Sequence, residues 1–128
     1  MARPEEQLHF QVATYLKMRY PKVIFLSEAS GARVSMGLAL KLKKMRSAHT
    51  HLDVYILQPK LVQNEQLYCG LILELKAKNI FKKDGTLLKS DHLDDQQKTI
   101  DLLNERGYMA CFACGFDEAK KIIDNYLN

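Results

Sequence analysis

Apolar residues recur every three or four positions in four stretches of the chain, which is the pattern of helices with one buried face. The predicted helices cover residues 4–20, 36–46, 93–106 and 117–126. Pro4 suits the first position of a helix, and Gly107 suits the residue after the end of one. Asp117 is expected to cap the last helix.

Short apolar runs between turn residues predict four strands, at residues 23–26, 52–57, 67–76 and 108–114. The polar segment 58–66 is expected to connect the second and third strands, which could pair as a hairpin. The polar segment 78–92 is expected to be a mobile loop and a candidate for substrate contact. Helices and strands intermingled in this order predict one mixed α/β domain over residues 1–128.

Composition narrows the class of protein without naming a function. The chain is 47% hydrophobic and 27% charged, as in soluble globular proteins. It lacks the ~18 consecutive apolar residues of a membrane span and the apolar run of a secretory signal, so we expect a cytoplasmic protein without membrane contact. Its three cysteines include Cys111 and Cys114 in a predicted strand, which favours buried thiols over the alternative of a metal or redox pair.

Basic residues are bunched in segments 41–46 and 76–83, although the net charge is only +4. Clustered cations suit a polyanion such as nucleic acid, whose phosphates they neutralise. A solvated basic surface explains the charge equally well when charge is considered alone.

The candidate chemistry lies at the ends of two predicted strands. Alternation places Glu74 and Lys76 on one face of their strand, whereas an isolated pair of this kind more often marks a strand end in water. Asp53 starts another apolar strand, and antiparallel pairing would bring it to Glu74. Two close carboxylates repel unless a cation lies between them, and oxygen ligands suit Mg²⁺ or Mn²⁺. With Lys76 beside them, the pattern predicts phosphodiester hydrolysis.

Asp53 and the run Glu74-Leu75-Lys76 resemble the signature of PD-(D/E)XK nucleases. More narrowly, nearly the whole chain resembles a stand-alone VRR-NUC domain of the kind found in phages. The similarity extends to an opening acidic helix, a glycine loop, a basic helix, a glutamine helix and the start of the last helix. These features lie at Glu5, at Ser30-Gly31 with Arg33, at 39–43, at Gln96 with Gly107-Tyr108, and at 116–119.

Four positions depart from the pattern of that family. Leu52 stands where proline usually precedes the aspartate, Arg46 and Thr50 replace common glycines, and His9 stands where glutamine is frequent. The carboxylates and the lysine are all present. We therefore expect activity to be retained and the loop before Asp53 to differ in geometry.

The resemblance implies a single-domain, restriction-endonuclease-like fold in which helices flank a mixed central sheet. It implies a DNA endonuclease that uses Mg²⁺ or Mn²⁺, prefers branched DNA such as a Holliday junction, and forms a homodimer. For a phage-encoded protein the location would be the host cytoplasm. Two alternatives stay open, a non-catalytic nucleic-acid-binding domain and a nuclease subunit of a restriction or repair assembly.

The resemblance also assigns roles to residues. Asp53, Glu74 and the main-chain carbonyl of Leu75 would bind metal, and Lys76 would be the catalytic lysine. Glu5, or Glu6 beside it, would bind a second metal or its water, although a favourable helix dipole explains either acid. Gln96 would orient Lys76 or contact phosphate, or else simply start a helix. Phosphate-binding candidates, each also readable as a surface cation, are Arg33, Lys41, Lys44 and Lys78. Two loop histidines, His49 and His51, could line the cleft or simply be exposed.

Overall fold

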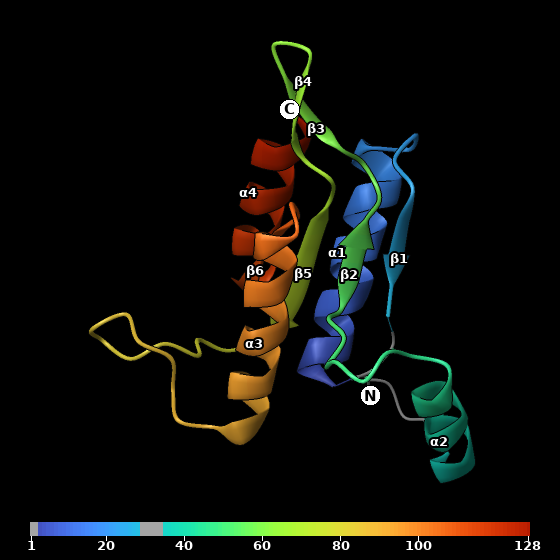
Figure 1. Ribbon diagram of the computed structural model, residues 1–128, viewed down its shortest axis with the longest axis vertical. Helices are drawn as coiled ribbons and strands as arrows, with labels where there is room; N and C mark the ends of the chain where they lie inside the picture. Colours follow the sequence, from blue (N-terminus) through green and yellow to red (C-terminus); the bar gives the residue numbers. More distant parts are fainter. Residues whose placement is uncertain (1–2, 29–34) are drawn as a thin grey trace.

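A computed structural model describes residues 3–28 and 35–128. A four-stranded sheet forms the centre of the molecule, with helices on both faces (Figure 1). The elements in chain order are α1 (Pro4–Arg19), β1 (Phe25–Ser27), α2 (Met36–Lys44), β2 (Val54–Ile56), β3 (Lys60–Val62), β4 (Glu65–Tyr68), β5 (Leu71–Lys76), α3 (Asp91–Glu105), β6 (Met109–Cys114) and α4 (Phe116–Leu127). The predicted mixed α/β class is confirmed.

The strand order is β1-β2-β5-β6. β1, β2 and β5 pair antiparallel, and β5 pairs parallel with β6. The predicted antiparallel pairing of the second and third strands is therefore confirmed for β2 and β5, whose register sets Val54 opposite Leu73. This register brings the start of β2 next to the end of β5.

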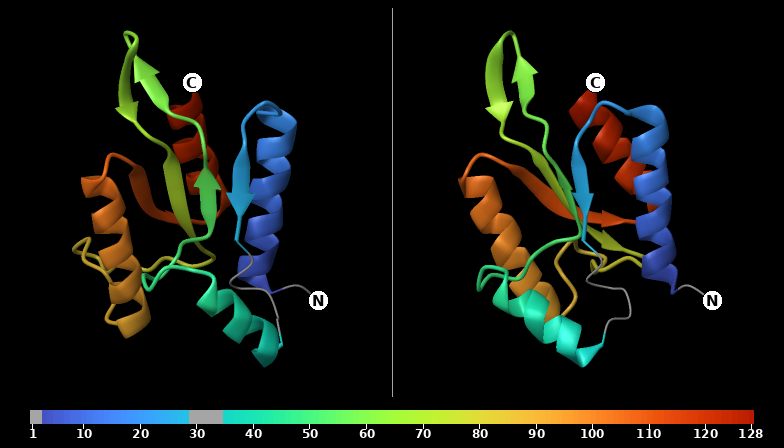
Figure 2. Two further views of the ribbon diagram at one scale, coloured as in Figure 1. Left: turned by 45° about the vertical axis from the view of Figure 1, so that its right-hand side comes forward. Right: turned by 90° about the vertical axis from the view of Figure 1, so that its right-hand side faces the viewer.

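Both faces of β5 are covered, so all six of its residues are buried. Leu71, Leu73 and Leu75 belong to a core shared with α1 and α4, whereas Ile72 faces a second core shared with α3. Figure 2 shows the helices on the two sides of the sheet. The polar side chains of Glu74 and Lys76, which alternate with the leucines, therefore lie on the α3 side.

A two-stranded ribbon, β3 and β4, corrects the expectation that residues 58–66 are a connection and that residues 67–76 are one strand. Gln63 and Asn64 at its tip have φ of 53° and 66°, as a tight two-residue hairpin requires. The ribbon is tied to α4 through Lys60, whose Nζ donates to the carbonyl of Tyr126 at 2.8 Å. The sequence did not predict this ribbon, because none of its residues is buried and no apolar face marks its strands.

Gly70 separates β4 from β5. A β-carbon at this position would lie 2.9 Å from the main-chain oxygen of Ile56, so β2 can approach only a glycine so closely. The start of α4 needs a second correction, because Gly115, with φ of 88°, precedes the helix and Asp117 lies in its first turn. Gly107, with φ of 95°, follows the end of α3 as predicted.

α2 differs from the other helices because none of its residues is buried. It projects from the body of the molecule at the end opposite the ribbon (Figure 1). No helix in the described part of the chain is long and apolar enough to cross a membrane.

The cysteine pair lies on β6 with its two thiols in different surroundings. Cys111 packs against the core shared with α1 and α4, whereas Cys114 packs against the core shared with α3. Burial raises the pKa of the Cys111 thiol to about 11, and neither cysteine forms a disulfide. Cys111 therefore has the character of a core thiol, whereas Cys114, at the end of the strand, is partly exposed.

Candidate active site

Asp53 lies immediately before β2, where the register of the sheet holds it against β5. Its amide donates to the carbonyl of Leu73 at 3.0 Å, and its Oδ2 accepts from the amide of Leu75 at 2.8 Å. Only 4% of the residue is exposed. The acid that interrupts this apolar run is thus a buried carboxylate fixed to the neighbouring strand.

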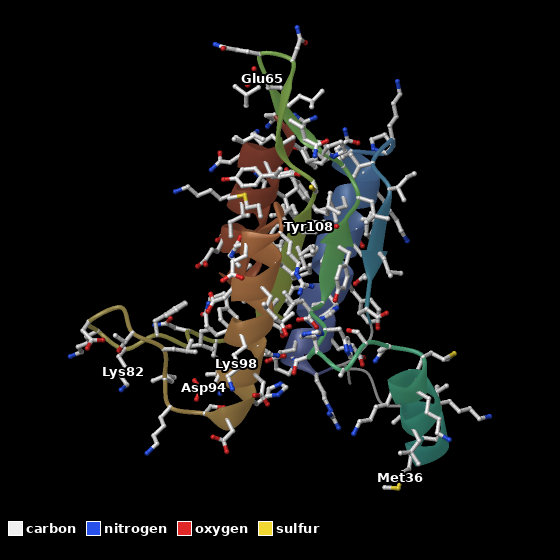
Figure 3. All side chains as sticks on the ribbon, viewed as in Figure 1. Met36, Glu65, Lys82, Asp94, Lys98 and Tyr108 are labelled. Carbon is white, nitrogen blue, oxygen red and sulfur yellow. The ribbon has the colours of Figure 1, made fainter. Side chains whose placement is uncertain are left out.

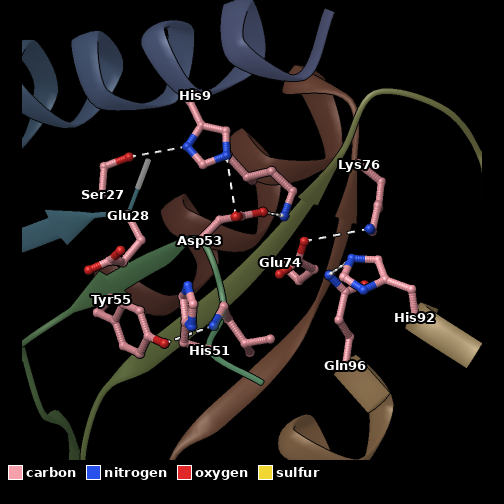
Figure 4. Close-up of polar contacts among 12 residues, drawn as sticks. His9, Ser27, Glu28, His51, Asp53, Tyr55, Glu74, Lys76, His92 and Gln96 are labelled. Carbon is pink, nitrogen blue, oxygen red and sulfur yellow. Dashed lines mark hydrogen bonds and ion pairs between the residues drawn. The ribbon is translucent and has the colours of Figure 1, made fainter. Parts of the chain in front are cut away.

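Glu74 and Lys76 project from the same face of β5, as strand alternation predicts. Lys76 Nζ lies 3.5 Å from Glu74 Oε2, and the residues are 8% and 4% exposed. Figure 4 shows both side chains directed into the space beside Asp53. The structure therefore brings together the three residues of the predicted signature.

The electrostatics of the carboxylates are dominated by burial and by their proximity. Burial, followed by the charge of Asp53, raises the pKa of Glu74 to about 9. Burial would also raise the pKa of Asp53, but hydrogen bonds with His9, Glu74 and the Leu75 amide hold it below its usual range. Without a cation, the pair is most stable with one negative charge.

A cavity of about 170 Å³ opens between these groups. Besides Asp53, Glu74 and Lys76, its lining includes Glu5 of α1 and Gln96 of α3. The described lining contains Glu5 but not Glu6, so Glu5 is the better placed of the two acids. The volume is below that of drug-sized ligand sites but ample for an ion with a phosphate group.

Gln96 is 4% exposed and has an incomplete set of hydrogen bonds. Its Nε2 lies 3.1 Å from Nε2 of His92, one turn earlier on α3. Its Oε1 is buried and has no hydrogen-bond partner in the described part of the chain. A buried amide oxygen in this state is costly, so it is suited to a ligand or a water in the cavity.

His9 is a site residue that the sequence marked only as a departure from the family pattern. Its Nε2 lies 3.4 Å from Asp53 Oδ1, and its Nδ1 lies 3.4 Å from the Ser27 hydroxyl (Figure 4). Its spacing from Glu5 could have placed His9 at the site, because residues four positions apart share one face of a helix.

The other departures surround the segment that leads to Asp53. Arg46 forms an ion pair with Glu28 and a hydrogen bond of 2.9 Å with Nε2 of His51. Leu52 is fully buried in the core on the α3 side, and Thr50 lines the cavity. In place of glycines and a proline, this segment is thus fixed by side-chain contacts.

The predicted phosphate-binding residues fall into separate regions. Lys41 and Lys44 are exposed on α2, and Lys78 is exposed on the segment after β5. Lys78 lines a second cavity, of about 390 Å³, that shares Glu5 and Lys76 with the first. Arg33 and the predicted glycine loop lie outside the described residues.

The two loop histidines also differ. His51 lines the cavity with the carboxylates, and burial, together with Arg46, lowers its pKa. His49 is exposed and contributes to the neighbouring surface pockets instead. Only His51 therefore fits the expectation of a cleft-lining residue.

The donors suit a hard divalent cation that keeps several of its waters. The described residues contain no group of three or more His, Cys, Asp or Glu side chains placed to hold one ion. Asp53 and Glu74 nevertheless offer two carboxylates. The amide of Leu75 points toward Asp53, and the carbonyl of a strand residue shares the side of its amide. Two carboxylates and a carbonyl match the limited protein coordination typical of Mg²⁺.

Comparisons with known proteins find a solved structure with a similar fold. No family model matches the sequence, and no curated protein matches it. Among solved structures, a VRR_NUC domain protein is similar with a TM-score of 0.65 and 20% sequence identity, over 99% of this chain and 90% of that chain. This chain therefore shares its fold with a VRR_NUC domain protein, in agreement with the restriction-endonuclease-like fold predicted from the sequence.

Proposed function

We propose that the protein is a metal-dependent DNA endonuclease whose active site contains Asp53, Glu74 and Lys76. The observation that carries the proposal is the convergence of these three buried side chains at one cavity, from two strands and with the Leu75 main chain between them. A fold needs no such cluster for stability, because two close buried carboxylates destabilise each other. The fold shared with a VRR_NUC domain protein supports the same assignment.

In this proposal Asp53, Glu74 and the Leu75 carbonyl hold Mg²⁺ or Mn²⁺. A divalent cation supplies charge neutralisation at the phosphate and a more acidic water for attack on phosphorus. Lys76 Nζ, 3.5 Å from Glu74, donates to a phosphoryl oxygen and stabilises the charge that develops there. Gln96 offers its buried Oε1 to a water or hydroxyl in the cavity, and Glu5 is a candidate ligand for a second ion.

The DNA path in this proposal extends from the catalytic cavity into the larger one beside it. Arg3 and Lys78 line that second cavity together with the apolar Pro4 and Ile80. Cations beside apolar side chains suit the alternation of phosphate and sugar along a strand. Lys41 and Lys44 of α2 would contact phosphates farther along the duplex, and Arg33, outside the described residues, stays a candidate for phosphate binding.

A preference for branched DNA and a homodimer complete the proposal. Two symmetric cuts at a junction require two active sites, which a two-fold dimer provides. The exposed apolar side chains of α2, among them Met36 at 81% and Leu40 at 56%, give such a dimer apolar surface to bury (Figure 3).

The test is cleavage of a labelled four-way junction and a matched linear duplex in Mg²⁺, Mn²⁺ or EDTA. Wild type is expected to cut the junction faster than the duplex, and only with a metal. Glu74→Gln and Lys76→Met are expected to bind DNA but to cut it far more slowly than wild type. Glu65→Gln, at the exposed tip of the ribbon, is the control and should cut like wild type (Figure 3).

Two results would remove the proposal. If wild type binds DNA but cuts no substrate with either metal, the protein is a binding domain. If Glu74→Gln cuts as fast as wild type, the chemistry occurs elsewhere. Light scattering of the protein with and without junction tests the dimer separately.

A further inference from the structure

The carboxylate of Asp53 has a separate donor at each of its oxygens. Oδ2 accepts from the Leu75 amide at 2.8 Å, and Oδ1 lies 3.4 Å from Nε2 of His9. The first donor belongs to the main chain of β5, a central strand, and is lost only if the sheet itself is disrupted. The second is a side chain of α1, which makes it the adjustable contact.

The imidazole of His9 is itself oriented by a second contact. Its Nδ1 lies 3.4 Å from Oγ of Ser27, the last residue of β1. An ionised carboxylate only accepts hydrogen bonds, so Nε2 of His9 carries the hydrogen. In the neutral ring Nδ1 is then the acceptor for the Ser27 hydroxyl. The three side chains therefore form a chain of contacts in which Ser27 meets Nδ1 of His9 and Asp53 meets Nε2.

Burial gives this chain its rigidity. The side chains of His9 and Asp53 are 12% and 6% exposed. Both nitrogens of the His9 ring have a protein partner at 3.4 Å, Asp53 at Nε2 and Ser27 at Nδ1. The ring is therefore placed to act on Asp53 and not on the cation.

We infer, resting on the function proposed above, that His9 is a positioning residue that holds Asp53 in its metal-binding orientation, with Ser27 fixing the ring. Carboxylates that bind metals commonly need such a partner, and its removal lowers metal affinity by about 10- to 100-fold. Glutamine at position 9 offers an amide N–H to the same oxygen. A glutamine variant should therefore preserve the contact that alanine removes.

The experiment measures Mn²⁺ affinity by titration calorimetry without DNA, so that its readout does not depend on cleavage. His9→Ala is expected to bind Mn²⁺ about 10- to 100-fold more weakly than wild type. His9→Gln should recover most of this loss, and Ser27→Ala should show a smaller one. His49→Ala changes an exposed loop histidine and is the matched control, expected to bind like wild type. Urea unfolding in EDTA establishes that each variant is folded.

A second readout separates positioning from direct ligation. We expect the electron paramagnetic resonance spectra of Mn²⁺ bound to wild type and to His9→Ala to be alike, with no signal from a coordinated histidine nitrogen in wild type that the variant lacks. Finding such a nitrogen would overturn the inference, because His9 would then be a ligand.

The affinities also distinguish the inference from the proposed function. If Asp53→Asn loses Mn²⁺ affinity but His9→Ala retains it, only the inference is overturned. If Asp53→Asn binds Mn²⁺ as wild type does, the proposed metal site is wrong and the role of His9 falls with it.

Discussion

Replacing Glu74 with glutamine is expected to stabilise the metal-free protein while strongly slowing cleavage. Burial and the charge of Asp53 raise the pKa of Glu74 to about 9 from 4.5. Folding therefore takes up a proton between these values, so the stability present below pH 4.5 is lost as the pH rises toward 9. Each pH unit in this window costs about 1.4 kcal/mol, which amounts to about 3 kcal/mol at pH 7. Glutamine does not ionise, so the variant avoids this cost. The gain is reduced by the loss of the contact between Glu74 and Lys76.

The assay is urea unfolding of wild type and Glu74→Gln in EDTA, from pH 5.5 to 8.5. The variant should be more stable, and the difference in unfolding free energy should grow with pH. Mn²⁺ at 100 times the Kd should stabilise wild type by about 2.7 kcal/mol and so offset most of this difference at pH 7. Glu65→Gln should show no such trend, because Glu65 is exposed at the ribbon tip. A variant no more stable than wild type at pH 8.5 in EDTA would refute the reasoning.

Three further substitutions test other parts of the structure. Lys76→Met should lower the single-turnover cleavage rate by roughly 10²- to 10³-fold with little change in Mn²⁺ affinity, and wild-type cleavage would contradict its role. Asp124→Asn should cost about 2 kcal/mol in urea unfolding at pH 7, because Asp124 accepts from Tyr15 and Tyr20 at 2.5 and 2.7 Å. Burial alone would raise the pKa of Asp124, but these bonds hold it below its usual range, so the cost should vanish once acid protonates the carboxylate; a cost independent of pH would contradict this. Gly70→Ala should lower Tm by several degrees, since its β-carbon would lie 2.9 Å from a main-chain oxygen of β2, and an unchanged Tm would contradict that close approach.

Much of the fold follows from hydrophobic periodicity, because most elements bury one face. The stripe of α1 through Leu8, Val12 and Leu16 is buried as predicted. The ribbon of β3 and β4 was missed for the converse reason. Its residues are mostly exposed, so no alternation of apolar and polar positions marks them.

The carboxylates and lysine of the site could be predicted because strand alternation and antiparallel pairing together determine which side chains meet. His9 could not be predicted from the same pattern, since its contact with Asp53 depends on how α1 packs over the sheet. The cap of α4 was misassigned because Asp117 is a common capping residue, whereas the turn after β6 requires the positive φ of Gly115.

The most direct test of a single catalytic metal site is a comparison of Asp53→Asn, Glu74→Gln and the double variant in single-turnover cleavage of a junction with saturating Mn²⁺. Residues that act as one unit give strongly non-additive losses. We predict that each single variant loses roughly 10³-fold and that the double variant loses no more. Losses that multiply to roughly 10⁶-fold would show that the two carboxylates act independently and would contradict the site described for Asp53 and Glu74.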